Sequence, residues 1–133
     1  MVEPVVPASG DGEDETANGP QFHVDTRETG AAVVLSVHGD VDMLTAPRIN
    51  EAVLEVLPRE HATVIVDLSD VDFLASAGMT ALVTAQRQLG PTAQFLLVAD
   101  GLGTSRPMKL MGIDAAIPLY RTLDEALIAS QHG

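Results

Sequence analysis

Residues 64–82 read VIVDLSDVDFLASAGMTAL, and this stretch decides the predicted fold. Its β-branched start, Val64–Val66, predicts a buried strand that ends near Asp67, and a polar turn at Ser69–Asp70 follows. The spacing of the apolar residues in the second half of the stretch predicts a helix. Ser76 stands where this helix begins, and its neighbours are alanines and a glycine, so we expect its hydroxyl to be sterically open.

Apolar runs and turn residues on either side of this stretch predict the remaining elements. Strands are expected at 21–27, 32–38, 62–68, 94–99 and 117–119, and helices at about 45–57, 76–89, 104–111 and from 122 onward. The order ββαβαβαβα predicts an α/β fold with a mixed, mostly parallel five-stranded sheet, an N-terminal antiparallel hairpin and about four helices.

Individual residues mark the ends of several of these elements. Thr45 is the expected N-cap of the first helix, and Pro58 is expected to end it. Pro118 lacks an N–H group, which favours an edge position for the last strand. Thr122 and Glu125 have the spacing of a capping box at the start of the last helix.

The composition of the chain excludes several classes of function. The net charge is −12, and only 3% of the residues are aromatic, which argues against nucleic-acid binding. The sequence has no cysteine, so disulfides, thiol catalysis and zinc–thiolate sites are excluded. We find neither a run of about 18 apolar residues nor a signal peptide, so we expect no membrane association and a cytoplasmic location.

The acidic residues are unevenly distributed along the chain. Residues 1–20 hold five of the 19 carboxylates and no basic residue, and they are rich in proline and glycine. Such a segment buries too little apolar surface to offset its ordering entropy, so we predict a disordered acidic tail. Residues 21–133 form the predicted domain, in which 14 acidic residues still outnumber seven basic ones.

Ser76 is the main candidate for chemistry. A short polar side chain at a helix start is commonly an N-cap, which is the structural interpretation. The functional interpretation is phosphorylation, because free N–H groups and the helix dipole tolerate an anion there. A phosphate would add about −1.5 to −2 charges to a surface that already carries the aspartates Asp40, Asp42, Asp70 and Asp72.

Metal-dependent and catalytic interpretations have weaker support. The pair Asp40–Asp42 with Asp67 resembles the acidic site of a phosphorylated receiver domain, but the only lysine, Lys109, falls in a predicted helix. Solvated turn residues are the alternative role for these acids. Nucleotide-binding glycine loops and the Gly-x-Ser-x-Gly elbow are absent, so we expect no enzyme activity, no cofactor and no metal.

Two further groups of residues have open interpretations. His23, His38, His61 and His132 show no spacing typical of a metal pair, and we expect them to be structural or exposed to solvent. The apolar residues Met108, Leu110, Met111 and Ile113 fit either the core or a partner surface.

The motifs together resemble those of the STAS domain, and of bacterial anti-sigma factor antagonists in particular. The resemblance covers residues 22–130 and depends on GDVDMLTAP at 39–47, DLS at 67–69 and FLASAGM at 73–79. It implies the STAS fold and binding to an anti-sigma factor that is also a serine kinase of the histidine-kinase-like ATPase type. Binding would free a sigma factor, phosphorylation would break the complex, and a phosphatase would reset it, with the antagonist a monomer or weak dimer.

The sequence departs from the family at the phosphorylated position. The family's usual string is Asp-Ser-Ser-Gly or Asp-Ser-Thr-Gly, with the acceptor just before the glycine. This chain has Ala75-Ser76-Ala77-Gly78, so either Ser76 takes the phosphate or this member is not switched in this way. A structural STAS subunit of a larger signalling or transport assembly, and a receiver-like or nucleotide-binding domain, are the alternative functions.

The partner surface implied by the resemblance comprises the loops 40–45 and 71–76 and the exposed face of the following helix. The expected partner-binding residues are Asp40, Asp42, Thr45, Asp72, Leu74, Ser76, Gly78, Met79 and Thr80.

Overall fold

The computed structural model describes residues 22–56 and 63–132. The predicted acidic tail at 1–20 and the predicted helix end at Pro58 lie outside the described residues. The strands are β1 His23–Thr29, β2 Ala32–His38, β3 Thr63–Asp70, β4 Gln94–Val98 and β5 Leu119–Tyr120. The helices are α1 Ala46–Val56, α2 Ser76–Leu89, the 3-10 turn η2 Gly90–Thr92, α3 Ser105–Leu110, α4 Ile113–Ala116 and α5 Leu123–His132.

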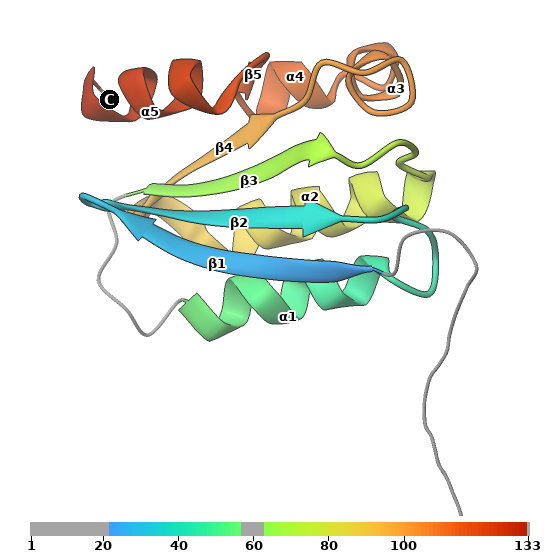
Figure 1. The fold of residues 1–133 in the computed structure, drawn as a ribbon, viewed down its shortest axis with the longest axis horizontal. Coiled ribbons are helices and arrows are strands. Elements are labelled where there is room, and N and C mark those ends of the chain that lie inside the picture. The colour runs from blue at the N-terminus through green and yellow to red at the C-terminus, as the bar shows by residue number, and fades with distance from the viewer. Residues whose placement is uncertain (1–21, 57–62, 133) are drawn as a thin grey trace, which may run out of the picture.

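The five strands form one sheet in the order β1-β2-β3-β4-β5 (Figure 1). β1 and β2 are antiparallel, and each later neighbour pair is parallel. Gly30 makes the tight turn of the hairpin with a φ of 62°, a conformation that glycine adopts without steric cost. The predicted α/β fold, with a mixed and mostly parallel five-stranded sheet, is therefore confirmed.

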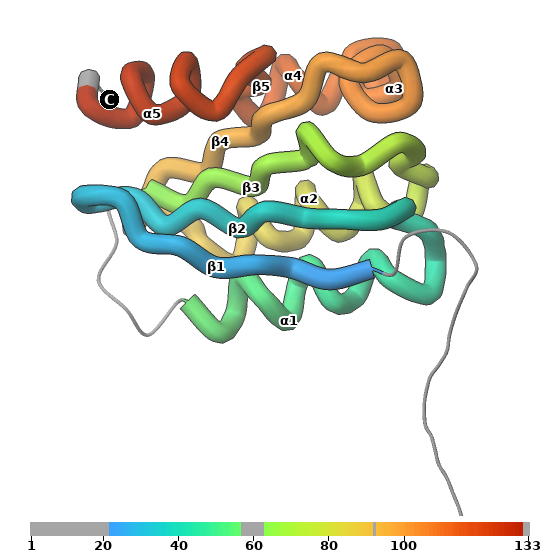
Figure 2. Tube along the Cα trace, in the orientation of Figure 1, coloured from blue at the N-terminus to red at the C-terminus, as the bar shows by residue number. Residues whose placement is uncertain are grey.

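The helices cover the two faces of the sheet unequally, as the tube in Figure 2 shows. α1 and α2 lie on one face, and α5 lies on the other, where it packs against β3, β4 and β5. Val33, Leu35 and Val37 of β2 belong to the large core under α1 and α2. Val34 belongs instead to a smaller core with Ala126 of α5, since successive side chains of a strand point to opposite faces.

The α5 side of the sheet is uncovered over β1 and the end of β2. Asp25 of β1 is exposed there, and Ser36 and His38 of β2 are only half-buried. Because β1 is an edge strand and α5 packs on β3, β4 and β5, polar side chains can occupy this open part of the sheet.

Several boundaries differ from the sequence-based prediction. The sequence predicts a turn at Ser69–Asp70, but β3 continues through these residues. The reason is that its pairing with β2 resumes after a register shift near His38. α4 was not predicted. Pro118 lies just before β5, where its carbonyl accepts a hydrogen bond from the Leu97 N–H (2.9 Å).

Other local predictions agree with the structure. The Thr122 hydroxyl accepts the Glu125 N–H (3.1 Å), as in the predicted capping box, while the Glu125 carboxylate accepts the N–H of Arg121 (3.2 Å). Met108 is fully buried, whereas Met111 is 67% exposed, so the apolar residues of this region divide between core and surface. No helix within the described part of the chain is long and apolar enough to span a bilayer.

The large core predicts a strong dependence on Leu82, which is 0% exposed on α2. We expect Leu82→Ala to lower the free energy of unfolding by about 2–5 kcal/mol, because truncation removes buried apolar surface and leaves a cavity. Leu54→Ala, at a 47% exposed position of α1, is the matched control and should change it by less than about 1 kcal/mol. Urea denaturation of both variants measures the difference, and equal losses would contradict this description of the core.

Candidate functional site

Three loops at the carboxyl ends of the parallel strands are joined by backbone hydrogen bonds. The Val41 N–H donates to the Phe73 carbonyl (2.9 Å), and the Ala75 N–H donates to the Val41 carbonyl (2.8 Å). The Leu74 N–H donates to the carbonyl of Gly103 (2.9 Å), which adds the loop after β4. We call residues 39–45, 71–76 and 101–104 together the loop face. Open α/β sheets commonly place their binding sites at this edge.

Buried side chains hold the loop face from beneath. Val41 and Leu74, which form an isolated parallel bridge, are 0% and 2% exposed. A Cβ atom on Gly78 would lie 2.5 Å from a Leu74 methyl carbon and 2.6 Å from one of Val41, so only glycine allows α2 to approach this closely. Three of the residues expected to bind a partner are buried instead: Leu74, Gly78 and Met79. They support the loop face from beneath.

Asp42 and Thr45 fix the loop before α1 through reciprocal hydrogen bonds. The Asp42 carboxylate accepts the N–H groups of Leu44 (2.9 Å) and Thr45 (3.0 Å), and the Thr45 hydroxyl accepts the Asp42 N–H (2.9 Å). This is the pattern of a capping box with Asp42 as the capping residue. Thr45, the predicted N-cap, does stand just before α1, but its hydroxyl accepts the Asp42 N–H, and the Asp42 carboxylate caps the turn that leads into the helix. The same hydrogen bonds, chiefly from Thr45, hold the pKa of the Asp42 carboxyl below its usual range.

Ser76 is the first residue of α2 and its side chain is exposed. The residue before it, Ala75, is the N-cap and contributes no side-chain hydrogen bond. The Gly78 and Met79 N–H groups donate to the Ala75 carbonyl (2.9 and 3.2 Å). Within the described residues, neither the Ser76 hydroxyl nor the N–H groups of Ser76 and Ala77 have a hydrogen-bond partner. An unpaired hydroxyl thus lies at the positive end of the helix dipole.

Ser76 and Ala77 face different flanks of α2. Ser76 lines a groove between α2 and the segment of α3 and α4, together with Met79, Thr80, Val83, Thr84, Arg87, Met111 and Ile113. Ala77 lines a shallow groove between α1 and α2, together with Met43, Ala46, Pro47, Asn50, Thr80, Ala81 and Thr84. The Ser76 hydroxyl therefore lies on the α3 side of the helix, whereas Ala77 lies on the α1 side.

Large exposed apolar side chains on the loop face were missed by the sequence analysis. They are Met43 (76% exposed), Leu44 (84%), Phe73 (54%) and Leu102 (81%). Asp40, Asp42, Asp72 and Asp100, all exposed, lie in the same loops or beside them. Apolar residues with a polar rim are typical of a protein-binding surface. The signal in the sequence was the occurrence of bulky apolar residues within polar loops.

The receiver-like arrangement of acids does not form. Asp67 is half-buried and accepts hydrogen bonds from the Ser69 N–H (3.0 Å) and hydroxyl (2.6 Å), while the Asp42 carboxylate accepts N–H groups of its own loop.

The only group of three or more potential metal-ligating side chains that lie together among residues 22–56 and 63–132 is His23, Asp25 and His38. Hairpin pairing places His23 directly opposite His38, a proximity that the spacing of the histidines along the sequence does not reveal.

The close packing at Gly78 predicts that even one added methyl group is costly. We expect Gly78→Ala to lower the free energy of unfolding by about 1–3 kcal/mol, because the new Cβ must displace Leu74 and Val41. Gln88→Ala, at an exposed position of the same helix, is the control and should change it by less than about 0.5 kcal/mol. Guanidinium denaturation checks both, and an unchanged or raised stability of Gly78→Ala would contradict the packing described.

The capping role of Asp42 predicts a pH-dependent contribution to stability. Since folding lowers the pKa of this carboxyl, its contribution is present above the unfolded-state pKa of about 3.9 and is lost as the pH falls through the folded-state pKa. We therefore expect Asp42→Ala to melt below the wild type at neutral pH and the difference to shrink in acid. Asp40→Ala, which removes a nearby exposed carboxylate, is the control. A pH-independent difference between Asp42→Ala and the wild type would refute the assignment.

Comparisons with known proteins agree with this geometry. The family model of the STAS domain matches residues 23–126. The anti-sigma-F factor antagonist RsfB of Mycobacterium tuberculosis is 36% identical over 110 residues, which are 83% of this chain and 90% of that protein.

Solved structures show the same arrangement of strands and helices. An anti-sigma factor antagonist from Mycobacterium paratuberculosis has a TM-score of 0.80 and 35% identity, covering 87% of this chain and 99% of that chain. The antagonist SpoIIAA of Bacillus, in its unphosphorylated form, has a TM-score of 0.63 over 85% of this chain and 99% of its own, and its 17% identity shows the fold alone. The family match and the identity to RsfB lead to one conclusion: this chain belongs to the STAS-domain family.

Proposed function

We propose that this protein is an anti-sigma factor antagonist, a non-enzymatic regulator that binds an anti-sigma factor through the loop face and thereby frees a sigma factor. The observation that carries the proposal is the exposed Ser76 hydroxyl at the start of α2, beside a surface of exposed apolar side chains. The antagonist role named for the 36% identical relative supports the same function.

The composition of the loop face indicates the chemistry of the partner. Leu44, Phe73 and Leu102 offer apolar surface whose burial would stabilise a complex. The surrounding aspartates, in a chain of net charge −12, favour a partner with a basic surface. Binding to such a partner should weaken as the salt concentration rises, since salt screens exposed charges.

Phosphorylation of Ser76 is the proposed switch. The partner would be an anti-sigma factor of the serine-kinase type with a histidine-kinase-like ATPase fold, and it would transfer phosphate to the Ser76 hydroxyl. The unpaired N–H groups at the start of α2 can donate hydrogen bonds to the phosphate, so the modified domain would stay folded. The added charge would have to be desolvated among the apolar side chains of the loop face, next to Asp40 and Asp72, and this cost would weaken the complex.

Two further features complete the proposed cycle. A phosphatase would remove the phosphate and restore binding. We propose that the antagonist acts in the cytoplasm. We also propose that it is a monomer or weak dimer, because a second copy bound to the loop face would block the partner.

The switch predicts opposite effects of two substitutions at one position. We expect Ser76→Ala to keep the affinity for the cognate anti-sigma factor and Ser76→Glu to weaken it at least about tenfold, which corresponds to about 1.4 kcal/mol. Gln88→Glu adds the same charge at the far end of α2 and is the control, with affinity expected near that of the wild type. Isothermal titration calorimetry measures the three affinities, and equal values for Ser76→Ala and Ser76→Glu would remove Ser76 as the switch.

The phosphate acceptor is tested separately by intact-mass analysis after incubation with the anti-sigma factor and ATP. We expect one phosphate on the wild type, mapped to Ser76, and none on Ser76→Ala. Binding without any phosphate transfer would leave the antagonist function and remove the switch.

A further inference from the structure

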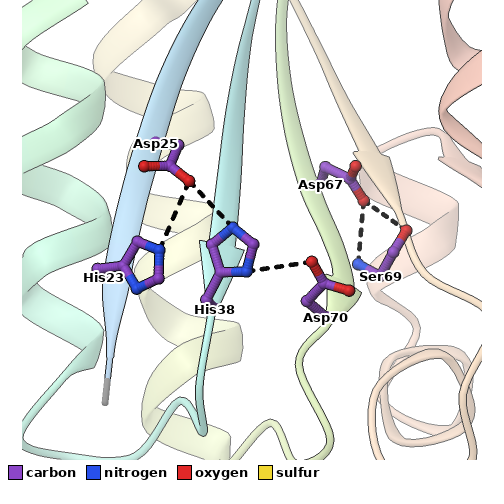
Figure 3. A network of polar contacts seen from close by, with 6 residues as sticks. All are labelled: His23, Asp25, His38, Asp67, Ser69 and Asp70. Atoms are coloured by element: carbon purple, nitrogen blue, oxygen red, sulfur yellow. Dashed lines mark hydrogen bonds and ion pairs between the residues drawn. The ribbon is translucent and has the colours of Figure 1, made fainter. Parts of the chain in front are cut away.

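Four side chains from three strands converge on the uncovered side of the sheet, beside the strand ends from which the loops 39–45 and 71–76 leave (Figure 3). One carboxylate oxygen of Asp25 lies 3.5 Å from the His23 Nε2 and 3.2 Å from the His38 Nε2. The His38 Nδ1 lies 3.1 Å from a carboxylate oxygen of Asp70. The two imidazole rings are stacked, with centroids 4.3 Å apart and planes 13° from parallel.

We propose that His23, Asp25 and His38 form a binding site for one divalent first-row transition-metal ion, for which Zn²⁺ is the reference. Each residue offers one ligand atom, and the three atoms lie within 4.8 Å of one another. None of these residues belongs to the loop face, so the metal proposal does not rest on the proposed antagonist function.

The distances agree with the requirements of a zinc ion. Zinc takes nitrogen and oxygen ligands at about 2.0–2.2 Å, so neighbouring ligand atoms in a tetrahedral site are about 3.4 Å apart. The Asp25 oxygen lies 3.5 Å from the His23 Nε2 and 3.2 Å from the His38 Nε2, and these two separations bracket that value. The three side chains would leave a fourth position for water. The stacked rings need only turn about their side-chain bonds to direct both nitrogens at the ion, and the half-exposed His23 is free to do so.

Asp70 supplies the orienting interaction that metal-binding histidines usually have. A carboxylate on Nδ1 holds the Nδ1–H tautomer of His38, which leaves the Nε2 lone pair for a metal. Asp70 is therefore a positioning residue. It comes from β3, next to the register shift that brings its side chain toward the end of β2.

The ligand types select the class of ion. Two imidazoles with one carboxylate suit zinc, nickel, cobalt or copper, whereas magnesium and calcium prefer oxygen ligands alone. The ion would connect the edge strand β1 to β2, and through Asp70 to the end of β3, where the loop 71–76 begins. Because only the folded chain brings the ligands together, binding should raise the melting temperature.

Titration of the full-length protein with Zn²⁺, followed by calorimetry, tests the site. We expect one ion per chain, and a Co²⁺-loaded sample should show the visible absorption of a low-coordinate nitrogen–oxygen site. His23→Ala and Asp25→Asn should abolish saturable binding, and Asp70→Asn should weaken it about 10–100-fold. The double variant His61→Ala/His132→Ala, which removes the other two histidines of the sequence, is the matched control and should bind like the wild type.

The outcomes separate a built site from chance binding by an acidic chain. Zinc binding that survives in His23→Ala, is lost in the His61/His132 double variant, or is equalled by Mg²⁺ would overturn the proposal. Circular dichroism of the metal-free variants checks folding, and His23→Ala is the decisive variant because its side chain is 55% exposed and contributes little to the core.

Discussion

The arrangement of the loop face depends on a few backbone hydrogen bonds between loops that are distant in sequence. Val41 pairs with Leu74 in a single parallel bridge, and Gly103 accepts the N–H of Leu74. Unpaired backbone groups are costly when buried, so these bonds fix the three loops relative to one another. The start of α2, and with it Ser76, takes its position from this pairing and from the absence of a side chain at Gly78.

The two faces of the sheet explain how one small domain can carry the two different kinds of site that we propose. α1 and α2 bury most of the apolar side chains, and their connecting loops carry exposed apolar residues at the carboxyl edge of the sheet. α5 is short and covers only part of the opposite face. The remaining area carries polar side chains of β1 and β2, and there histidine and aspartate can approach each other in contact with solvent.

The charge of the protein affects the two sites differently. At the loop face the aspartates lie around exposed apolar side chains, so they would contribute to the recognition of the proposed partner. At the open part of the sheet the carboxylates lie within 3.5 Å of imidazole nitrogens, where they can share either a proton or a metal ion. An overall acidic composition alone does not distinguish these two uses.

The sequence by itself determined the order of the elements apart from the short α4 and η2, the mixed sheet and the place of Ser76 at a helix start, because periodicity, turn residues and helix ends are local properties of the chain. Tertiary structure decided which residues of the binding loops are exposed, since Leu74 and Phe73 are neighbours in sequence but have opposite burial. It also decided that Asp42 caps the loop before α1, which depends on where the loop is held. The meeting of His23 with His38 requires strand register, which comes from pairing between segments and is not encoded in the spacing of residues along one segment.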